Sequence, residues 1–382
     1  MIRWNGRIIR VPIHVVLLCI LLQGMEAQAR LQSRTIAGHE VLKYFSLYEL
    51  RRSVFAAAPP FVIFQDSSGI FWFGGPHGLF SYHEHEERWT SHEETVDGRG
   101  SLTWVQSIAT DKRARIWACD GFVDRRTFLL DSGRWRDANQ HRPSKFRPIG
   151  RILIAGHSGT IWFVSSEGLI AYDGERWSGP FSPPESTVQL YSQLKLTYAD
   201  KQSETLAAAQ EQMRKRYGDA EPTRPPWTAE VHSGVEDRDG DIWLGATRGI
   251  WRFVQKARRW EVYSTHGLAE EVSLITEDRY GRIWFADADG HVVLYDKRND
   301  RWTPYDLVFD DATVNAIYVD RAGQTLIGTG AGIILLDEPT GKIRPLVAQV
   351  NGRAVRNVSA IMEDNQKRVW IGTSEAILVL RG

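Results

Sequence analysis

Three short stretches carry residue types that could bind a metal ion or a phosphate group. Asp237–Asp241 spaces its carboxylates like a calcium loop, but its glycine is misplaced for that geometry and no bidentate acid follows where one is needed. His83–Glu86 puts two imidazoles on one side of an extended segment, where they could hold a metal, although we prefer to interpret it as a solvated turn. Gly328–Gly332 is spaced like a phosphate-binding loop, but a strand follows it where a dinucleotide site needs a helix N-terminus. We therefore predict neither a metal nor a cofactor.

The sequence also lacks the common motifs of nucleophilic and zinc-dependent catalysis. It contains no Gly-x-Ser-x-Gly elbow, no His-Glu-x-x-His helix and no cysteine pair. What remains is a set of polar and aromatic loop residues that differ from one repeat to the next. A structural repeat needs the same residue in each copy whereas a pocket needs different ones, so this variation is compatible with recognition, and also with drift. The candidate ligand-binding residues are His77, Trp104, Asp120, Lys145, Glu167, Arg248, His266, Asp287 and Asp289.

The element that must position these residues is a unit that recurs along the chain. Its most complete copy, Val272–Tyr305, reads as four short half-buried strands at Val272–Thr276, Arg282–Ala286, His291–Tyr295 and Arg301–Tyr305. Four such strands form one propeller blade. A core residue on the second strand marks seven copies, at Trp72, Trp117, Trp162, Trp243, Trp284, Leu326 and Trp370. The sequence therefore predicts an all-β, seven-bladed β-propeller.

Two further markers support the count of seven. An aspartate precedes the core residue by six positions in all copies but the third, where Gly156 stands: Asp66, Asp111, Asp237, Asp278, Asp320 and Asp364. We interpret each aspartate as the brace of a tight hairpin, with its carboxylate bonded to nearby backbone amides. The fourth strand carries a basic-aromatic pair, at Arg88-Trp89, Arg134-Trp135, Arg176-Trp177, Arg259-Trp260 and Arg301-Trp302.

The seventh copy lacks a fourth strand, and the N-terminal region supplies a candidate for it. Lys43–Leu47 resembles the fourth-strand stretch Arg259–Tyr263 and precedes the first copy at the appropriate distance. A strand exchanged in this way would close the ring and remove sheet edges that could otherwise template aggregation. We therefore expect residues 30–59 to be a lead-in with the ring-closing strand, and residues 60–382 to be the propeller.

The composition and the first residues bear on location and partners. The chain has 382 residues, 42% of them hydrophobic, with 47 basic and 47 acidic side chains and no basic stripe, so nucleic acid is not an expected partner. Arg3, Arg7 and Arg10 precede the apolar stretch Val11–Leu22, which is too short to span a bilayer comfortably. Residues 1–29 therefore read as a signal peptide cleaved after Ala29, with an uncleaved anchor as the alternative. The mature chain would be periplasmic or secreted, with Cys119 as its single thiol and no membrane span.

A segment between the third and fourth copies interrupts the regular spacing. Trp162 and Trp243 are about twice as far apart as other successive core residues. Ser203–Tyr217 is rich in helix formers and prolines flank it, so residues 181–227 are expected to form a helical insertion. It would overhang the face on which propellers usually bind ligands, either as a lid, wall or docking surface, or as a solvated decoration.

The unit at Val358–Thr373 resembles the two-component regulator propeller repeat, through its Val-x-x-Ile-x-Glu-Asp spacing and its Trp-Ile-Gly-Thr ending. The resemblance extends over residues 43–382. It implies a propeller fold and, often, a periplasmic sensor region that precedes a membrane helix and a histidine kinase and frequently senses carbohydrate. The repeats are also distantly similar to streptogramin lyase propellers, whose catalytic residues have no matching positions here.

Together these observations predict an exported, monomeric, non-catalytic propeller. It would bind a small molecule, a glycan or a protein partner such as an envelope sensor kinase on its loops, in signal transduction linked to a two-component system. An enzyme is the first alternative, a lyase or hydrolase that pairs His77 or His266 with Asp287 or Glu167 over the central channel. A structural scaffold for protein interactions is the second.

Overall fold

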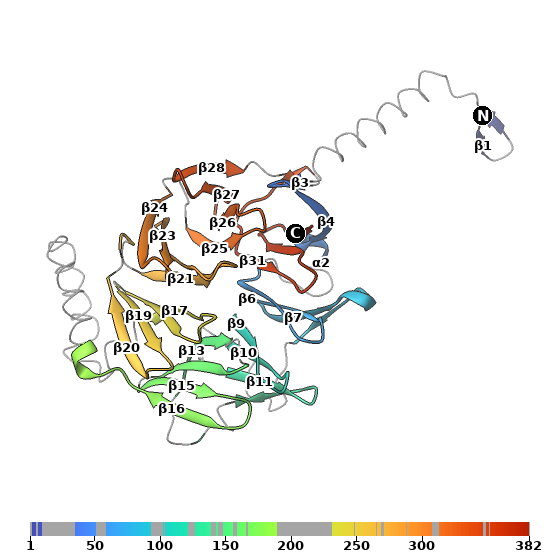
Figure 1. Ribbon diagram of the computed structural model, residues 1–382. Coiled ribbons are helices and arrows are strands. Elements are labelled where there is room, and N and C mark those ends of the chain that lie inside the picture. The colour runs from blue at the N-terminus through green and yellow to red at the C-terminus, as the bar shows by residue number, and fades with distance from the viewer. Residues whose placement is uncertain are drawn as a thin grey trace, which may run out of the picture.

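Seven antiparallel sheets, six of four strands and one of five, follow one another around a ring in the computed structural model (Figure 1). In six of them the strands lie in the order of the sequence, and in the seventh the N-terminal strands lie beside those of the last repeat. The first strand of every repeat contacts the first strands of both neighbouring repeats. These first strands therefore form the inner wall of the ring. The predicted seven-bladed propeller is confirmed.

The structure describes residues 2–4, 7–9, 35–50, 59–92, 102, 104–120, 127–138, 143, 148–155, 159–165, 167–188, 231–247, 249–264, 266–268, 271–287, 289–307, 313–346, 349–350 and 352–381.

The first three blades precede the insertion. Blade 1 comprises β5 (Val62–Gln65), β6 (Phe71–Gly75), β7 (Gly78–His83) and β8 (Arg88–Ser91). Blade 2 comprises β9 (Val105–Thr110), β10 (Ile116–Asp120), β11 (Thr127–Asp131) and β12 (Arg134–Asp137). Blade 3 comprises β13 (Pro148–Ala155), β14 (Ile161–Ser165), β15 (Gly168–Tyr172) and β16 (Trp177–Phe181).

The other four blades complete the ring. Blade 4 comprises β17 (Val231–Glu236), β18 (Ile242–Ala246), β19 (Gly249–Val254) and β20 (Arg259–Tyr263). Blade 5 comprises β21 (Val272–Glu277), β22 (Ile283–Asp287), β23 (His291–Asp296) and β24 (Arg301–Asp306), each within a residue of its predicted bounds. Blade 6 comprises β25 (Val314–Val319), β26 (Thr325–Thr329), β27 (Gly332–Asp337) and β28 (Lys342–Leu346). Blade 7 comprises β31 (Ala360–Glu363), β32 (Val369–Gly372), β33 (Ala376–Leu380) and β4 (His39–Ser46).

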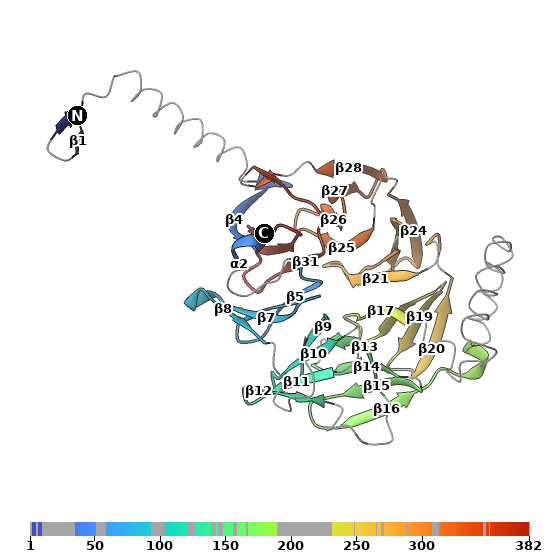
Figure 2. The ribbon, with the colours of Figure 1, turned by 180° about the vertical axis from the view of Figure 1, so that it is seen from behind.

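Ring closure occurs where it was predicted. Strand β4 pairs antiparallel with β33, with Tyr44 opposite Leu378, and both views place β4 beside the C-terminal end of the chain (Figures 1 and 2). A bidentate ion pair reinforces the closure from the neighbouring blade, because both terminal nitrogens of Arg368 donate to the Glu84 carboxylate, at 2.7 and 2.8 Å. Lys43 of β4 donates to the same carboxylate at 2.9 Å. One partly buried acid thus joins blade 1 to both chain segments of blade 7.

The repeated aspartates brace their hairpins as expected and also hold the core tryptophans. In blade 5, Asp278 Oδ1 accepts the backbone N–H groups of Tyr280 and Arg282, while Oδ2 accepts the indole N–H of Trp284 at 3.0 Å. The same indole bond joins Asp66 to Trp72, Asp111 to Trp117, Asp237 to Trp243, and Asp364 to Trp370. Each indole is buried, so this bond satisfies a donor that would otherwise destabilise the core.

Two blades depart from this arrangement and recruit a partner from elsewhere. Blade 3 has no hairpin aspartate, and the indole N–H of Trp162 donates instead to Glu236 Oε2 of blade 4, at 2.6 Å. Blade 6 has Leu326 in place of the tryptophan, and the Oδ2 atom of Asp320 lies 3.2 Å from Nε2 of His39, in the N-terminal closing strand. In both cases the missing half of the pair comes from the next blade around the ring.

Several smaller elements and two sequence predictions complete the description. β3 (Thr35–Ile36) extends the seventh sheet beyond β4, α2 (Leu47–Leu50) follows β4, η1 (Glu84–Glu86) lies between β7 and β8, and β29 (Gln349–Val350) pairs with β30 (Arg353–Ala354). Of the predicted signal peptide, residues 2–4 and 7–9 are described, as the paired strands β1 (Ile2–Trp4) and β2 (Arg7–Ile9). Of the predicted insertion, residues 181–188 are described, with a helical turn at residues 185–188, and the rest lies outside the described residues.

Candidate functional site

The antiparallel strand order gives the ring two chemically different faces. We call one the loop face: it carries the turns between second and third strands and the connections between blades. We call the other the hairpin face: it carries the aspartate hairpins and the turns between third and fourth strands. Lys297, in a turn of the second kind, contacts both Asp237 and Asp239 of the hairpin in the preceding blade, at 2.9 and 2.8 Å. The two kinds of turn therefore share one face.

The predicted ligand-binding residues that the structure describes belong to the loop face. His77 is exposed in the turn between β6 and β7, and Glu167 is exposed in the turn between β14 and β15. The ring of Trp104 packs against Phe61, with 5.3 Å between ring centroids. Asp120 ends β10, and two further candidates, Lys145 and Arg248, lie outside the described residues.

The remaining three candidates lie in blades 4 and 5. The ring of His266 stacks on Trp302 at 4.0 Å, and burial lowers the pKa of His266 despite the nearby charge of Asp300. Asp287 is buried, and its Oδ1 atom accepts the backbone N–H of Asp289, so these two candidates share one turn. The imidazole that contacts Asp287 belongs to His291, whose Nδ1 atom lies 2.8 Å from Oδ2 of Asp287. His291 was not among the predicted residues, although its spacing of four from Asp287 was visible in the sequence.

A second histidine cluster on the loop face joins blades 4 and 5. Nδ1 of His232 lies 2.9 Å from Oε1 of Glu271, and Nε2 lies 2.9 Å from the hydroxyl of Thr247. Thr247 and Glu271 also form an isolated β-bridge. The three residues come from different strands or connections, so no local sequence signal connects them. The arrangement is a hydroxyl, an imidazole and a carboxylate in series.

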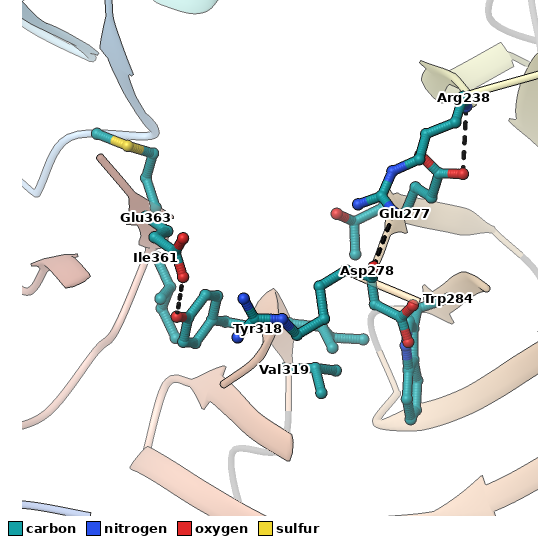
Figure 3. Close-up of a pocket in the computed structure, with 12 residues that line it drawn as sticks. Arg238, Glu277, Asp278, Trp284, Tyr318, Val319, Ile361 and Glu363 are labelled. Carbon is teal, nitrogen blue, oxygen red and sulfur yellow. Dashed lines mark hydrogen bonds and ion pairs between the residues drawn. The ribbon is translucent and has the colours of Figure 1, made fainter. Parts of the chain in front are cut away.

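The hairpin face contains a cavity of about 270 Å³ (Figure 3). It lies against the ends of the inner strands β21, β25 and β31, and therefore opens at the central axis of the ring. None of the predicted ligand-binding residues lines it. Its lining consists of Arg238, Thr276, Glu277, Asp278, Arg279, Trp284, Ile317, Tyr318, Val319, Ile361, Met362 and Glu363.

On one side of the cavity, Arg238 and Glu277 form a linked pair, as Figure 3 shows. Nε of Arg238 lies 3.5 Å from Oε2 of Glu277, and its backbone N–H donates to Oε1 at 3.2 Å. Nη1 of Arg238 donates to the backbone carbonyl of Arg279 at 2.7 Å. Lys297 stands 3.5 Å from Glu277 on the same side. The Glu277 side chain is 5% exposed, so it meets its cations largely out of water.

On the opposite side, the hydroxyl of Tyr318 donates to Oε2 of Glu363 at 2.7 Å (Figure 3). Lys367 lies 3.4 Å from the other oxygen of Glu363. Burial alone would raise the pKa of Glu363, but these contacts and the charge of Arg279 hold it below its ordinary value. Burial and the bond to Glu363 raise the pKa of Tyr318. At neutral pH the cavity therefore presents an ionised carboxylate and a neutral phenol.

Neither a metal centre nor a membrane span is found in the described part of the chain. No three or more histidine, cysteine, aspartate or glutamate side chains there come together in a way that could hold a metal ion. Among the same residues, no helix combines the length and the apolar character that a bilayer crossing requires. Cys119, predicted to be the single thiol of the mature chain, is buried and unbridged.

The family model of the two component regulator propeller matches residues 352–375. The match falls on the seventh repeat, where the sequence resemblance was recognised, and confirms it there. No curated protein sequence matches the chain significantly.

Among solved structures, the chain is similar to the extracellular domain of a putative one component system from B. thetaiotaomicron, with 17% identity and a TM-score of 0.58 over 85% of this chain. It is also similar to the extracellular domain of a putative hybrid two component system from the same organism, with 15% identity and a TM-score of 0.57 over 86% of this chain. The chain spans 38% and 40% of those two structures. A streptogramin B lyase is similar over 88% of this chain and 96% of its own, with 13% identity and a TM-score of 0.58. At these identities the likeness establishes the fold alone.

Proposed function

We propose that this chain is an exported, non-catalytic propeller that binds a small polar molecule, and that it acts in sensing linked to a two-component system. The observation that carries the proposal is the hairpin-face cavity, in which polar groups from four blades converge on one concave site. Small-molecule sites commonly have this form, a concave space with a few fixed polar groups. The propeller match at residues 352–375 and the similarity to extracellular domains of putative signalling systems support the sensing role.

The cavity takes precedence over the loop face as the ligand site. Its polar groups are oriented by contacts with one another, as in the Tyr318–Glu363 and Arg238–Glu277 pairs. On the loop face, Asp287 is engaged within its own turn and His266 is stacked on Trp302. Fixed side chains lose little conformational entropy on binding, so a preformed cavity gives more affinity per contact.

A thermal-shift screen of sugars, amino acids and small organic acids tests the proposal. A ligand that prefers the folded state must raise Tm, and at a hundred times its Kd it stabilises the fold by about 2.7 kcal/mol. We expect Tyr318→Phe, which keeps the ring and removes the hydroxyl, to reduce the ligand-induced rise in Tm. His77→Ala on the loop face serves as the control and should leave the rise unchanged. A hit that depends on His77 and not on Tyr318 would place the site on the loop face.

A hydrolase is the second candidate, because of the His232 cluster. Its order of hydroxyl, imidazole and carboxylate matches the roles of nucleophile, general base and orienting acid in acyl transfer. Turnover of p-nitrophenyl esters by the purified chain, lost in both Thr247→Ala and His232→Ala and retained in Thr247→Ser, would support it. If no turnover is seen, or if turnover persists in His232→Ala, the cluster is a structural contact between blades 4 and 5.

A further inference from the structure

The acidic side chains that line the hairpin-face cavity each form at least one ion pair. Glu277 meets Arg238 at 3.5 Å, and Glu363 meets Lys367 at 3.4 Å. The third acid, Asp278, accepts a hydrogen bond from Nε of Arg282 at 2.7 Å, and the same guanidinium also pairs with Glu338. Arg279 belongs to none of these pairs.

Arg279 is the cation left over in this arrangement. Within the described residues it takes part in no ion pair, and its Nη1 atom is buried without a hydrogen-bond partner. A guanidinium is charged at every relevant pH, so Arg279 cannot remove the unpaired donor by losing a proton. A buried polar group without a partner raises the free energy of the folded state, and such groups are rare enough to need an explanation.

Resting on the function proposed above, we propose that the ligand of this cavity is a small hydroxylated monocarboxylate whose carboxylate pairs with Arg279. The planar guanidinium presents several N–H donors, so a carboxylate that docks on its cavity side neutralises the shared charge even where Nη1 stays covered. Because Glu277, Asp278 and Glu363 line the same cavity, they repel a ligand with one negative charge less than they repel a phosphate dianion, which favours a monocarboxylate.

The rest of the lining specifies what else the ligand must carry. Glu363 and Glu277 stand on opposite sides of the cavity (Figure 3), and their side-chain oxygens can accept hydrogen bonds. The Tyr318 hydroxyl donates to Glu363 and has acceptor capacity left. Hydroxyl groups on the ligand satisfy these acceptors without adding charge. A fully apolar acid offers these acceptors no donor, so hydroxyls at two ends of the ligand are required.

Calorimetric titration with matched pairs of compounds tests this assignment. Each pair has the same carbon chain and hydroxyls and differs in one carboxylate, as in gluconate and sorbitol, or lactate and 1,2-propanediol; glucose 6-phosphate serves as the dianion. We expect at least one monocarboxylate to bind at least about tenfold more tightly than its neutral partner, and Arg279→Met to abolish that difference. Arg298→Met, on an exposed turn of the same face, is the control and should preserve it.

A second measurement needs no ligand. Because Nη1 of Arg279 is buried without a hydrogen-bond partner, Arg279→Met should raise the Tm of the ligand-free protein, whereas Arg298→Met should leave it unchanged. A lowered Tm in Arg279→Met would overturn the assignment, as would monocarboxylates that bind no better than the neutral compounds. If neutral sugars or amino acids bind and their binding depends on Tyr318, the proposed function stands and this inference falls. If nothing in either panel binds the cavity, the proposed function falls with it.

Discussion

The carboxylate of Glu84 connects the first blade to both halves of the last, and its contribution to stability can be worked out from its surroundings. The hydrogen bonds from Arg368, together with that from Lys43, lower the pKa of Glu84 to about 2 against the effect of burial. The ordinary value is 4.5. Since a tenfold change in acid dissociation is worth about 1.36 kcal/mol, the interactions are worth at most about 3.4 kcal/mol at neutral pH.

The realised value is smaller because water reaches part of the site. The Glu84 side chain is 18% exposed and that of Lys43 is 33% exposed, so we expect about half of the upper bound, about 1.5–2 kcal/mol. For a chain of this size, that corresponds to a fall in Tm of about 2–4 °C in Glu84→Gln. Glu86→Gln is the matched control, because Glu86 lies in the same turn, is exposed, and pairs with Arg88 of its own blade.

The pH dependence gives the sharper assay. The folded-state pKa lies below the unfolded value, so the stabilisation is complete above about pH 4.5 and disappears as the pH falls toward 2. The difference in unfolding free energy between the wild type and Glu84→Gln, from urea denaturation, should therefore be constant from pH 7 to 5 and shrink steadily below. If Glu84→Gln matches Glu86→Gln at pH 7, or if its deficit is the same at pH 3 as at pH 7, the reasoning about ring closure is wrong.

Three further predictions follow from the same architecture. Glu236→Ala should destabilise the fold by about 1–3 kcal/mol in chemical denaturation, because it leaves the buried indole N–H of Trp162 without its acceptor; an unchanged midpoint would contradict this. Deletion of residues 30–48 removes β4 and should lower Tm strongly or cause aggregation, visible in scattering, whereas an unchanged monomer would refute closure by this strand. Replacement of residues 181–227 by a short Gly-Ser loop should preserve the β-type circular dichroism signal and most of the stability, and collapse would mean that the insertion belongs to the core.

Much of the ring could be predicted because its determinants are local and repeated. The spacing between Asp278 and Trp284 recurs in other blades, and it reflects both the hairpin turn and the bond from carboxylate to indole. The missing hairpin aspartate of blade 3 and the missing core tryptophan of blade 6 were visible in the sequence. The residues that replace their contacts were not. Glu236 lies 74 residues from Trp162, and no single-sequence pattern connects a missing brace in one blade to an acid in the next.

The cavity was not predictable from positions that vary between repeats. Its charged lining comes instead from positions that nearly repeat, an acid before the hairpin aspartate and an arginine after it, as in Glu277 and Arg279. In the sequence these residues look like ordinary charged residues of surface turns. At the inner edge of the ring they converge, since the inner strands of neighbouring blades are in contact. The ion pairing of each arginine depends on side-chain contacts across blades, and these cannot be read from a sequence.

The closing strand has a consequence for how the molecule is made. Tyr44 in β4 pairs with Leu378 in β33, so the ribosome produces one partner long before the other. At typical synthesis rates the interval is on the order of tens of seconds, far longer than a hairpin needs to form. Throughout that time β4 has an unpaired edge while the intermediate blades are able to fold. Completion of the ring is therefore a late event, and the early segment must be kept from pairing with other chains until its own partner arrives.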